Sequence, residues 1–200
     1  MTQRTATVER KSKETEINIE LNIDGQGETK IQTPIGLLSH MLELFAFHGL
    51  FDLNVEVQKA DTEIDIHHTN EDIGIVLGKT FKEALGDMQG IRRFGCACAP
   101  MESTLGQTTI DISGRGYLSL NPAVVPGSEE GYAGNYLEHF LESFAHNLGA
   151  TLNVKIDNPS DDLHTNLETV FKSLGLALDQ ATQIDPRRKG SVPSTKGIID

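Results

Sequence analysis

The segment His67-His68-Thr69-Asn70-Glu71 occurs a second time, with changes, as His164-Thr165-Asn166-Leu167-Glu168. The two copies align without a gap as far as the Leu-Gly pairs at 77–78 and 174–175. Residues four apart lie on one face of an α-helix. Each copy therefore places an imidazole beside a carboxylate, which is a donor pair that suits a borderline divalent metal ion.

The repeat extends beyond this segment. Setting His40 on His139 aligns further pairs without a gap: Glu43 with Glu142, Phe45 with Phe144, Leu53 with Leu152 and Val55 with Val154. Both halves therefore predict strands, a helix, a strand and a helix. This defines an α+β fold of duplicated half-domains, each a roughly four-stranded β-sheet with two helices on one face. The predicted boundaries are 1–89, 90–183 and a tail at 184–200, within one pseudo-symmetric domain.

The pattern of apolar residues predicts the elements along the chain. Residues 4–24 alternate in their later part and predict a strand that ends at Asp24-Gly25, a hairpin signal. Next come a strand at 29–32, a helix from Thr33-Pro34, a strand at 51–58 and the first repeated helix to about Gly86. The second half predicts strands at 93–98, 106–112 and 116–120, a loop at 122–134, a helix at 135–148, a strand at 151–156 and the second repeated helix to about 182. The polar tail is by itself typical of a disordered end.

Composition limits the class of protein. The chain of 200 residues is 38% hydrophobic, which is enough for a core, and no apolar run reaches the length of a membrane span. A net charge of −12 argues against a nucleic-acid partner. The N-terminus lacks the apolar region of a signal peptide, so we expect a cytoplasmic protein. Cys96 and Cys98 cannot form a disulfide framework, and we expect two core thiols.

The adjacent histidines of the first copy can serve two metal ions, because His68 lies about 100° round the helix from His67. The simplest pseudo-symmetric arrangement groups His40, His68, His164 and Glu168 at one site, and His139, His67, Glu71 and Thr165 at the other. A threonine hydroxyl is a poor ligand compared with imidazole, so we expect the second site to hold its ion more weakly. Spacing alone leaves open whether one subunit or several supply the ligands.

Each of these signals has a plainer alternative. A single His-x-x-x-Glu on a helix is usually a solvated pair, but a copy in register, with a second pair of equivalent histidines, favours a metal site. Four cations near turns stand out in this acidic chain: Arg93, Arg115, Lys172 and Lys196. Surface salt bridges are the default for such residues. Together with a metal site, they indicate a small anionic substrate that carries a phosphate or another dianion.

The sequence resembles the imidazoleglycerol-phosphate dehydratases of histidine biosynthesis. The matching segments follow the family's order over nearly the whole chain: 13–15, 35–42, 64–72, 90–95, 100–101, 111–115, 168–172 and 193–197. The resemblance implies a hydro-lyase that converts D-erythro-imidazole-glycerol phosphate to imidazole-acetol phosphate. It also implies two Mn²⁺ ions per active site and a homo-oligomer of 24 subunits with active sites at subunit interfaces.

The resemblance assigns roles by motif position. It implies metal ligands at His40, His68, His164 and Glu168, and at His67, Glu71 and His139. It implies that the phosphate is held by Arg93, Arg115, Ser194 and Lys196, which brings the 184–200 tail to the active site. Lys172 lines the site, and Glu14 acts as acid and base. The implied catalytic residues are Glu14, His40, His68, Glu71 and Glu168, and these bind the substrate together with His67 and His164.

Two departures from the family pattern affect this interpretation. Thr165 stands where the family's second motif, His-His-x-x-Glu, has its second histidine, and Ser39 stands where an aspartate precedes His40. Ser39 can still orient His40. Because of Thr165, the alternative hypothesis is a non-catalytic or weakened member of the family with an impaired second metal site. A third hypothesis is an unrelated domain that binds a phosphorylated ligand, in which His67 and Glu71 hold no metal.

Overall fold

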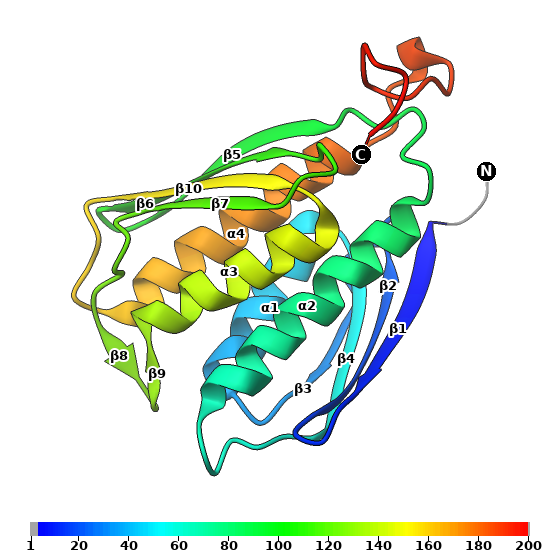
Figure 1. The fold of residues 1–200 in the computed structure, drawn as a ribbon. Coiled ribbons are helices and arrows are strands. Elements are labelled where there is room, and N and C mark those ends of the chain that lie inside the picture. The colour runs from blue at the N-terminus through cyan, green and yellow to red at the C-terminus, as the bar shows by residue number, and fades with distance from the viewer. Residues whose placement is uncertain (1–3, 200) are drawn as a thin grey trace.

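The computed structural model describes residues 4–199 and places its α-helices between two four-stranded β-sheets (Figure 1). The first half contains β1 (Thr5–Lys11), β2 (Glu16–Asn22), β3 (Thr29–Gln32), α1 (Gly36–Gly49), β4 (Asp52–Lys59) and α2 (Ile66–Leu85). The second half contains β5 (Phe94–Met101), β6 (Thr104–Asp111), β7 (Tyr117–Asn121), β8 (Ser128–Glu129), β9 (Tyr132–Ala133), α3 (Gly134–Leu148), β10 (Thr151–Asp157) and α4 (Leu163–Thr182). A short 3-10 helix, η1 (Pro186–Arg188), follows. Between residues 4 and 199, no helix is both long and apolar enough to cross a membrane.

The two halves have the same topology. Their four-stranded sheets have the orders β1-β2-β4-β3 and β5-β6-β10-β7, so each strand of one sheet has a counterpart in the other. In both sheets the last pair, β3 with β4 and β7 with β10, is parallel, and the other pairs are antiparallel. The predicted fold class, duplicated half-domains with two helices on one face of each sheet, is confirmed.

The halves pack through their helices, α1 against α4 and α2 against α3. Two repeat-equivalent glycines allow this close approach. A Cβ at Gly78 of α2 would lie 2.6 Å from the carbonyl oxygen of Phe144 in α3, and a Cβ at Gly175 of α4 would collide with the carbonyl oxygen of Phe45 in α1. Phe45 and Phe144 are themselves repeat equivalents. The repeat therefore encodes a reciprocal contact between the halves.

An aromatic cluster joins the halves at the centre of the core. Phe45 lies 5.4 Å from Phe51, 5.9 Å from Phe81 and 6.4 Å from Phe144, between ring centroids. All four rings are at most 1% exposed. Burial of one such side chain stabilises the fold by roughly 1.5–3 kcal/mol. Since the cluster takes rings from both halves, neither half can bury it alone.

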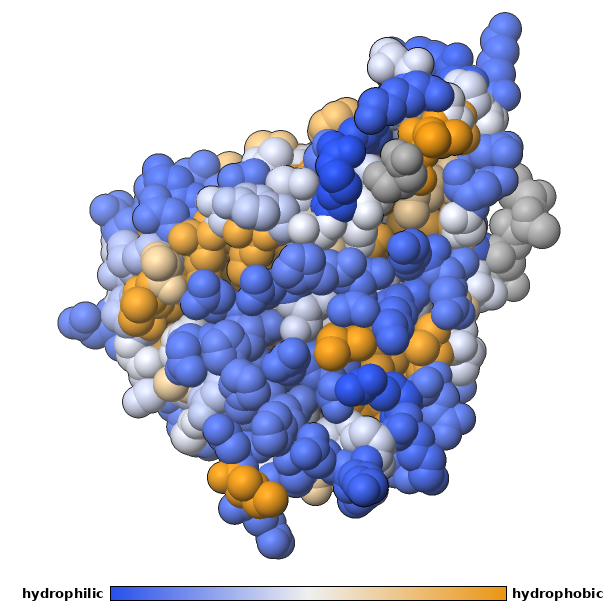
Figure 2. Space-filling model, viewed as in Figure 1, coloured by the Kyte–Doolittle hydropathy of each residue, from blue (hydrophilic) through white to orange (hydrophobic). Residues whose placement is uncertain are grey.

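Polar side chains cover most of the face that contains α2 and α3 (Figure 2). Figure 2 shows a mostly hydrophilic face over α2 and α3, with separate hydrophobic patches. Strand residues alternate between the helix side of each sheet and the outer side, and the outer side is solvated. Cys96 and Cys98 lie on the outer side of β5 and are exposed. The prediction of two core thiols was therefore wrong, because their alternation places them away from the helices.

Three predictions about local structure were also wrong. The stretch 4–24 forms two paired strands, β1 and β2, instead of one. Asp24-Gly25 does not close a hairpin, because β2 and β3 are not paired with each other. Strand β4 lies between them: it pairs with β2 on one side and, in parallel, with β3 on the other. Asp52 holds the loop that connects β2 to β3. Its Oδ1 accepts hydrogen bonds from the backbone N–H groups of Gln26 (2.8 Å) and Glu28 (3.2 Å). The stretch 122–134 contains the β8–β9 hairpin.

The tail packs on the second half through backbone hydrogen bonds. Gly90 donates to Ser191 (3.0 Å), Asp185 donates to Gly90 (2.9 Å), and Ile91 forms a bridge with Ile184. These bonds involve groups far apart in the sequence, which explains why the composition of the tail alone suggested a disordered end.

Candidate metal centre

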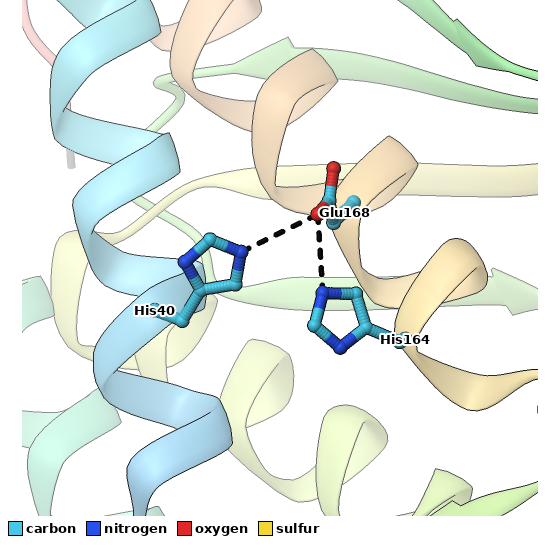
Figure 3. A group of neighbouring side chains, drawn as sticks. All are labelled: His40, His164 and Glu168. Carbon is cyan, nitrogen blue, oxygen red and sulfur yellow. Dashed lines mark hydrogen bonds and ion pairs between the residues drawn. The ribbon is translucent and has the colours of Figure 1, made fainter.

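Three side chains that could hold a metal ion converge between α1 and α4. His40 extends from α1, and His164 and Glu168 extend from α4 (Figure 3). The Oε1 atom of Glu168 faces both rings, 3.3 Å from His40 Nε2 and 3.1 Å from His164 Nε2. The three donor atoms lie within 4.8 Å of one another. We call these residues the first cluster, and its two nitrogens and one oxygen suit a borderline divalent ion.

Charged neighbours set the protonation of the first cluster. Lys172 forms an ion pair with the second oxygen of Glu168. Burial alone would raise the pKa of Glu168, but the hydrogen bonds with Lys172 and His40 hold it below its ordinary value. Burial also opposes a charge on His164, yet the carboxylates of Glu129 and Glu168 raise its pKa. The carboxylate is therefore ionised at neutral pH and available as a ligand.

A second, equivalent group lies between α2 and α3. His67 and Glu71 extend from α2, with 3.2 Å between His67 Nε2 and Glu71 Oε2. His139 of α3 places its Nδ1 2.8 Å from His67 Nδ1. We call these three residues the second cluster. Both clusters combine the repeated His-x-x-x-Glu helix of one half with a histidine from a helix of the other half. Helix packing across the halves therefore brings the same residue types together twice. Among residues 4–199, the donor atoms of the first cluster lie within 4.8 Å of one another, and those of the second cluster do not.

An aspartate begins each of these two helices. The carboxylate of Asp65 accepts the backbone N–H of His67 (3.0 Å), and that of Asp162 accepts the backbone N–H of His164 (3.2 Å). Such side-chain caps satisfy N–H groups that have no partner in the first turn. They fix where each helix starts, and so which residues share its donor face. The aspartates two positions before each histidine were a usable sequence signal for these caps.

The repeat-equivalent residues His68 and Thr165 have different surroundings. His68 is grouped with Glu14 and Asp61 and lies apart from the first cluster, to which the sequence had assigned it. Its Nδ1 lies 2.7 Å from Asp61 Oδ2, and this hydrogen bond raises the pKa of His68. Thr165 is only 6% exposed, and its hydroxyl donates to Asp162 Oδ2 (2.8 Å). Within residues 4–199, each cluster therefore has three donors, and the fourth predicted member lies elsewhere.

The turn that carries Glu14 is fastened to α2. Ser12 Oγ accepts the backbone N–H of Glu14 (3.1 Å). Thr15 Oγ1 donates to Asp72 Oδ2 (2.5 Å), and Arg10 Nε donates to Asp72 Oδ1 (2.9 Å). Asp72 follows Glu71 directly in α2. The exposed Glu14 is thus held at a fixed place relative to the repeated helix, near His68.

The predicted phosphate-binding residues have different hydrogen-bond partners. Arg93 forms a two-fold ion pair with Asp111 (2.6 and 3.1 Å) and donates to the carbonyl of Pro193 (3.1 Å). This bond places Arg93 beside the tail, where Ser194 Oγ accepts the backbone N–H of Lys196 (3.2 Å). Lys172 lies at the first cluster, and Arg115 is exposed in the β6–β7 turn. One chain therefore joins Arg93 to the tail. Within residues 4–199, no hydrogen bond links Arg115 or Lys172 to Arg93 or to the tail.

Sequence reasoning missed three acidic residues around the candidate ligands. Asp61 contacts His68, Glu129 contacts His164, and Asp72 fastens the Glu14 turn. Asp61 and Asp72 stand close to the repeated segment and were accessible to a search for carboxylates near ligands. Glu129 lies in the β8–β9 hairpin, 35 residues before His164, and no sequence periodicity connects the two.

Comparisons with known proteins show what this chain is similar to. A family model described as imidazoleglycerol-phosphate dehydratase matches residues 33–178. Proteins of that name from Geobacter metallireducens and Pelobacter propionicus are 49% and 48% identical to this chain over 196 residues, which cover 98% of this chain and 99% of each relative. Among solved structures, the dehydratase from Staphylococcus aureus is 32% identical with a TM-score of 0.79, and it covers 90% of this chain and 99% of its own. The protein from Pyrococcus furiosus is 34% identical with a TM-score of 0.80, and the match covers 96% of this chain and 99% of that one.

Proposed function

Because this chain belongs to the imidazoleglycerol-phosphate dehydratase family, we propose that it removes water from D-erythro-imidazole-glycerol phosphate and forms imidazole-acetol phosphate. The reaction is that of a hydro-lyase in histidine biosynthesis. The observation that carries the proposal is the convergence of His40, His164 and Glu168 from the two halves of the chain. It forms a nitrogen-rich donor set of the kind that binds an ion next to an imidazole substrate.

We propose Mn²⁺ as the ion, with two ions per active site. His40, His164 and Glu168 would hold one ion together with His68, and His67, Glu71 and His139 would hold the other. When bound, the ions supply Lewis-acid stabilisation of the negative charge that develops on the substrate's imidazole ring. The role of the chain is to fix the ligands, and the ionised state of Glu168 supports that role.

Protein side chains supply the remaining chemistry. Glu14 is the proposed acid and base: it is exposed on a turn fastened to α2 and lies near His68. A positioned carboxylate can take the proton from the substrate carbon and return a proton to the leaving hydroxyl. Arg93, Arg115, Ser194 and Lys196 would hold the phosphate, and Lys172 would line the site. The bond from Arg93 to Pro193 supports a role for the 184–200 tail in this site.

The exposed position of His68 supports a shared active site. His68 uses Nδ1 toward Asp61, which leaves Nε2 for an ion bound by another copy of the chain. In the proposed homo-oligomer, with 24 subunits expected, His68 would complete the first cluster of a neighbour. Glu14, which accompanies His68, would then reach the same active site.

Thr165 favours a variant of this proposal with an unequal pair of metal sites. Its hydroxyl hydrogen is committed to Asp162, and its side chain is buried. It therefore cannot replace the imidazole that the pseudo-symmetric arrangement requires at this position. The second ion would be held weakly, and turnover would be reduced or lost.

The test is turnover of the purified full chain with D-erythro-imidazole-glycerol phosphate. We expect product formation with Mn²⁺, loss of product after treatment with a chelator, and recovery when Mn²⁺ is added back. Turnover that persists in a fully demetallated protein would contradict the metal mechanism. A protein that binds Mn²⁺ and assembles but never forms product would identify a non-catalytic member of the family.

A further inference from the structure

The β8–β9 hairpin lies beside the beginnings of both repeated helices. Its second strand is anchored to α2, because the buried Tyr132 donates its hydroxyl to Asn70 Oδ1 (2.8 Å). Asn70 in turn donates to the carbonyl of Tyr136 in α3 (2.8 Å). Asn70 lies between His67 and Glu71 in the sequence, so this anchor is part of the helix that carries the second cluster.

The approach to the first strand is packed against the start of α4. A Cβ at Gly127 would lie 2.7 Å from the carbonyl oxygen of Asp161 and 2.8 Å from the nitrogen of Leu163. Gly127 also has a φ of +96°, in the region that favours glycine. Asn166 of α4 donates to the carbonyl of Pro126 (3.4 Å). The hairpin is therefore held at both ends, and the position of Glu129 between them is defined.

Glu129 extends from this hairpin to the far nitrogen of His164. Its carboxylate oxygens lie 3.2 and 3.3 Å from His164 Nδ1, while Nε2 of the same ring lies 3.1 Å from Glu168. The ring is thus held at both nitrogens. A neutral imidazole that binds an ion through Nε2 carries its proton on Nδ1, and that N–H needs an acceptor. Glu129 is placed as this acceptor.

We propose that Glu129 is a positioning residue, which fixes the ring orientation and tautomer of His164 so that Nε2 is presented to an ion bound with His40 and Glu168. This inference rests on the proposed metal-dependent function. A carboxylate behind a ligating histidine also raises the basicity of the ring, and loss of such a partner typically weakens metal binding by about 10- to 100-fold. Asp61 has the same relation to Nδ1 of His68.

The second cluster is built differently. Nδ1 of His67 faces Nδ1 of His139, so each ring has an imidazole where His164 has a carboxylate. Two imidazoles can share only one proton in that contact, and a protonated ring nitrogen cannot bind an ion. Glu129 therefore adds to the difference that Thr165 introduces, and it makes the first cluster the tighter site.

The test is titration of the full chain with Mn²⁺ by calorimetry at neutral pH, for the wild type and three variants. For E129A we expect binding at the tighter site to weaken by about 10- to 100-fold. For E129Q we expect a smaller loss, because the amide oxygen still accepts from Nδ1–H. The matched control is E130Q, since Glu130 is the exposed neighbour that loses the same charge, and its affinity should not change.

The outcomes separate this inference from the function on which it rests. A wild type that binds no Mn²⁺ would refute the proposed metal function itself. Normal affinity in E129A would overturn the positioning role while leaving the function intact. Equal losses in E129A and E129Q would also overturn it, because they would identify Glu129 as a direct ligand. The metal-free E129A and E129Q proteins should melt at the wild-type temperature, which shows that the loss of affinity does not come from unfolding.

Discussion

Thr165 and His68 occupy equivalent positions in the repeat, yet their side chains have different partners. His68 is exposed and bonded to Asp61, whereas Thr165 is buried and caps the start of α4 together with Asp162. The hydroxyl of Thr165 contributes to the local stability of α4, and an imidazole at this position would contribute to metal binding. The side chain at position 165 therefore serves the helix cap and supplies no nitrogen donor.

We predict that T165H raises the metal content per subunit, because it supplies the nitrogen donor that position 165 lacks in the proposed second site. We also expect a lower melting temperature, since a larger ring replaces a side chain that is only 6% exposed. Metal analysis of the purified protein and thermal unfolding measure the two effects.

The matched control for this variant is T165V, which keeps the shape of threonine without its hydroxyl. It should lose about 1 kcal/mol of stability with no change in metal content, because only the bond to Asp162 is removed. A folded T165H protein with the metal content of the wild type would show that position 165 does not face a metal site.

At the scale of elements, the first strands and the last helix are connected by one side chain. Arg4 forms an ion pair with Asp24, just after β2, and also donates to the carbonyl of Thr182 at the end of α4. The carbonyl groups in the last turn of a helix lack helical partners, and a cation there is favourable. This contact connects an element of the first half to an element of the second.

The Arg4–Asp24 pair predicts a pH dependence of stability. The hydrogen bond with Arg4 lowers the pKa of Asp24 from its ordinary value of 3.8. A carboxyl whose pKa is lower in the folded state stabilises the fold above the unfolded pKa, and this contribution is lost as the pH falls through the folded pKa. D24N should therefore be less stable than wild type by about 0.5 kcal/mol at neutral pH, because the pair is partly exposed. The difference should fade below about pH 4.

Denaturant unfolding across pH 3–7 measures this difference. E63Q is a suitable control, since Glu63 is exposed in the loop before α2 and forms no ion pair within residues 4–199. It removes the same charge and should show no such pH dependence. A D24N deficit that stays constant down to pH 3 would show that the contact with Arg4 does not depend on the ionised carboxylate.

At the scale of the whole molecule, the crossing of helices between the halves decides both the core and the candidate site. The α1–α4 contact that brings Gly175 against the carbonyl of Phe45 also brings His40 to His164 and Glu168. Stability and donor geometry therefore depend on the same interface.

We predict that G175A destabilises the fold by about 1–3 kcal/mol, because the added Cβ collides with the backbone of α1. It should also weaken binding of Mn²⁺ by the first cluster, since α1 has to move away from α4. The control is G36A in the exposed first turn of α1, where the nearest atom to a new Cβ is 3.8 Å away. That variant should be neutral or slightly stabilising. A G175A protein as stable as the wild type would refute the close crossing.

The sequence by itself determined the duplicated order of strands and helices and the two His-x-x-x-Glu faces. These features follow from periodicities of 2 and 3.6 residues, which short-range sterics and backbone hydrogen bonds impose. Family membership also followed from it, because the motifs are local and ordered. The repeat of Phe45 with Phe144, and of Gly78 with Gly175, was visible too, although its meaning was not.

Only the tertiary structure decided which helices meet and which side chains face solvent. The fold packs α1 on α4 and α2 on α3, buries Thr165, exposes Cys96 and keeps His68 apart from the first cluster, to which the sequence had assigned it. It also brings Glu129 to His164 from a stretch with no periodic signal. Such contacts depend on the shapes of surfaces that are distant in the chain, and a local pattern carries no information about them.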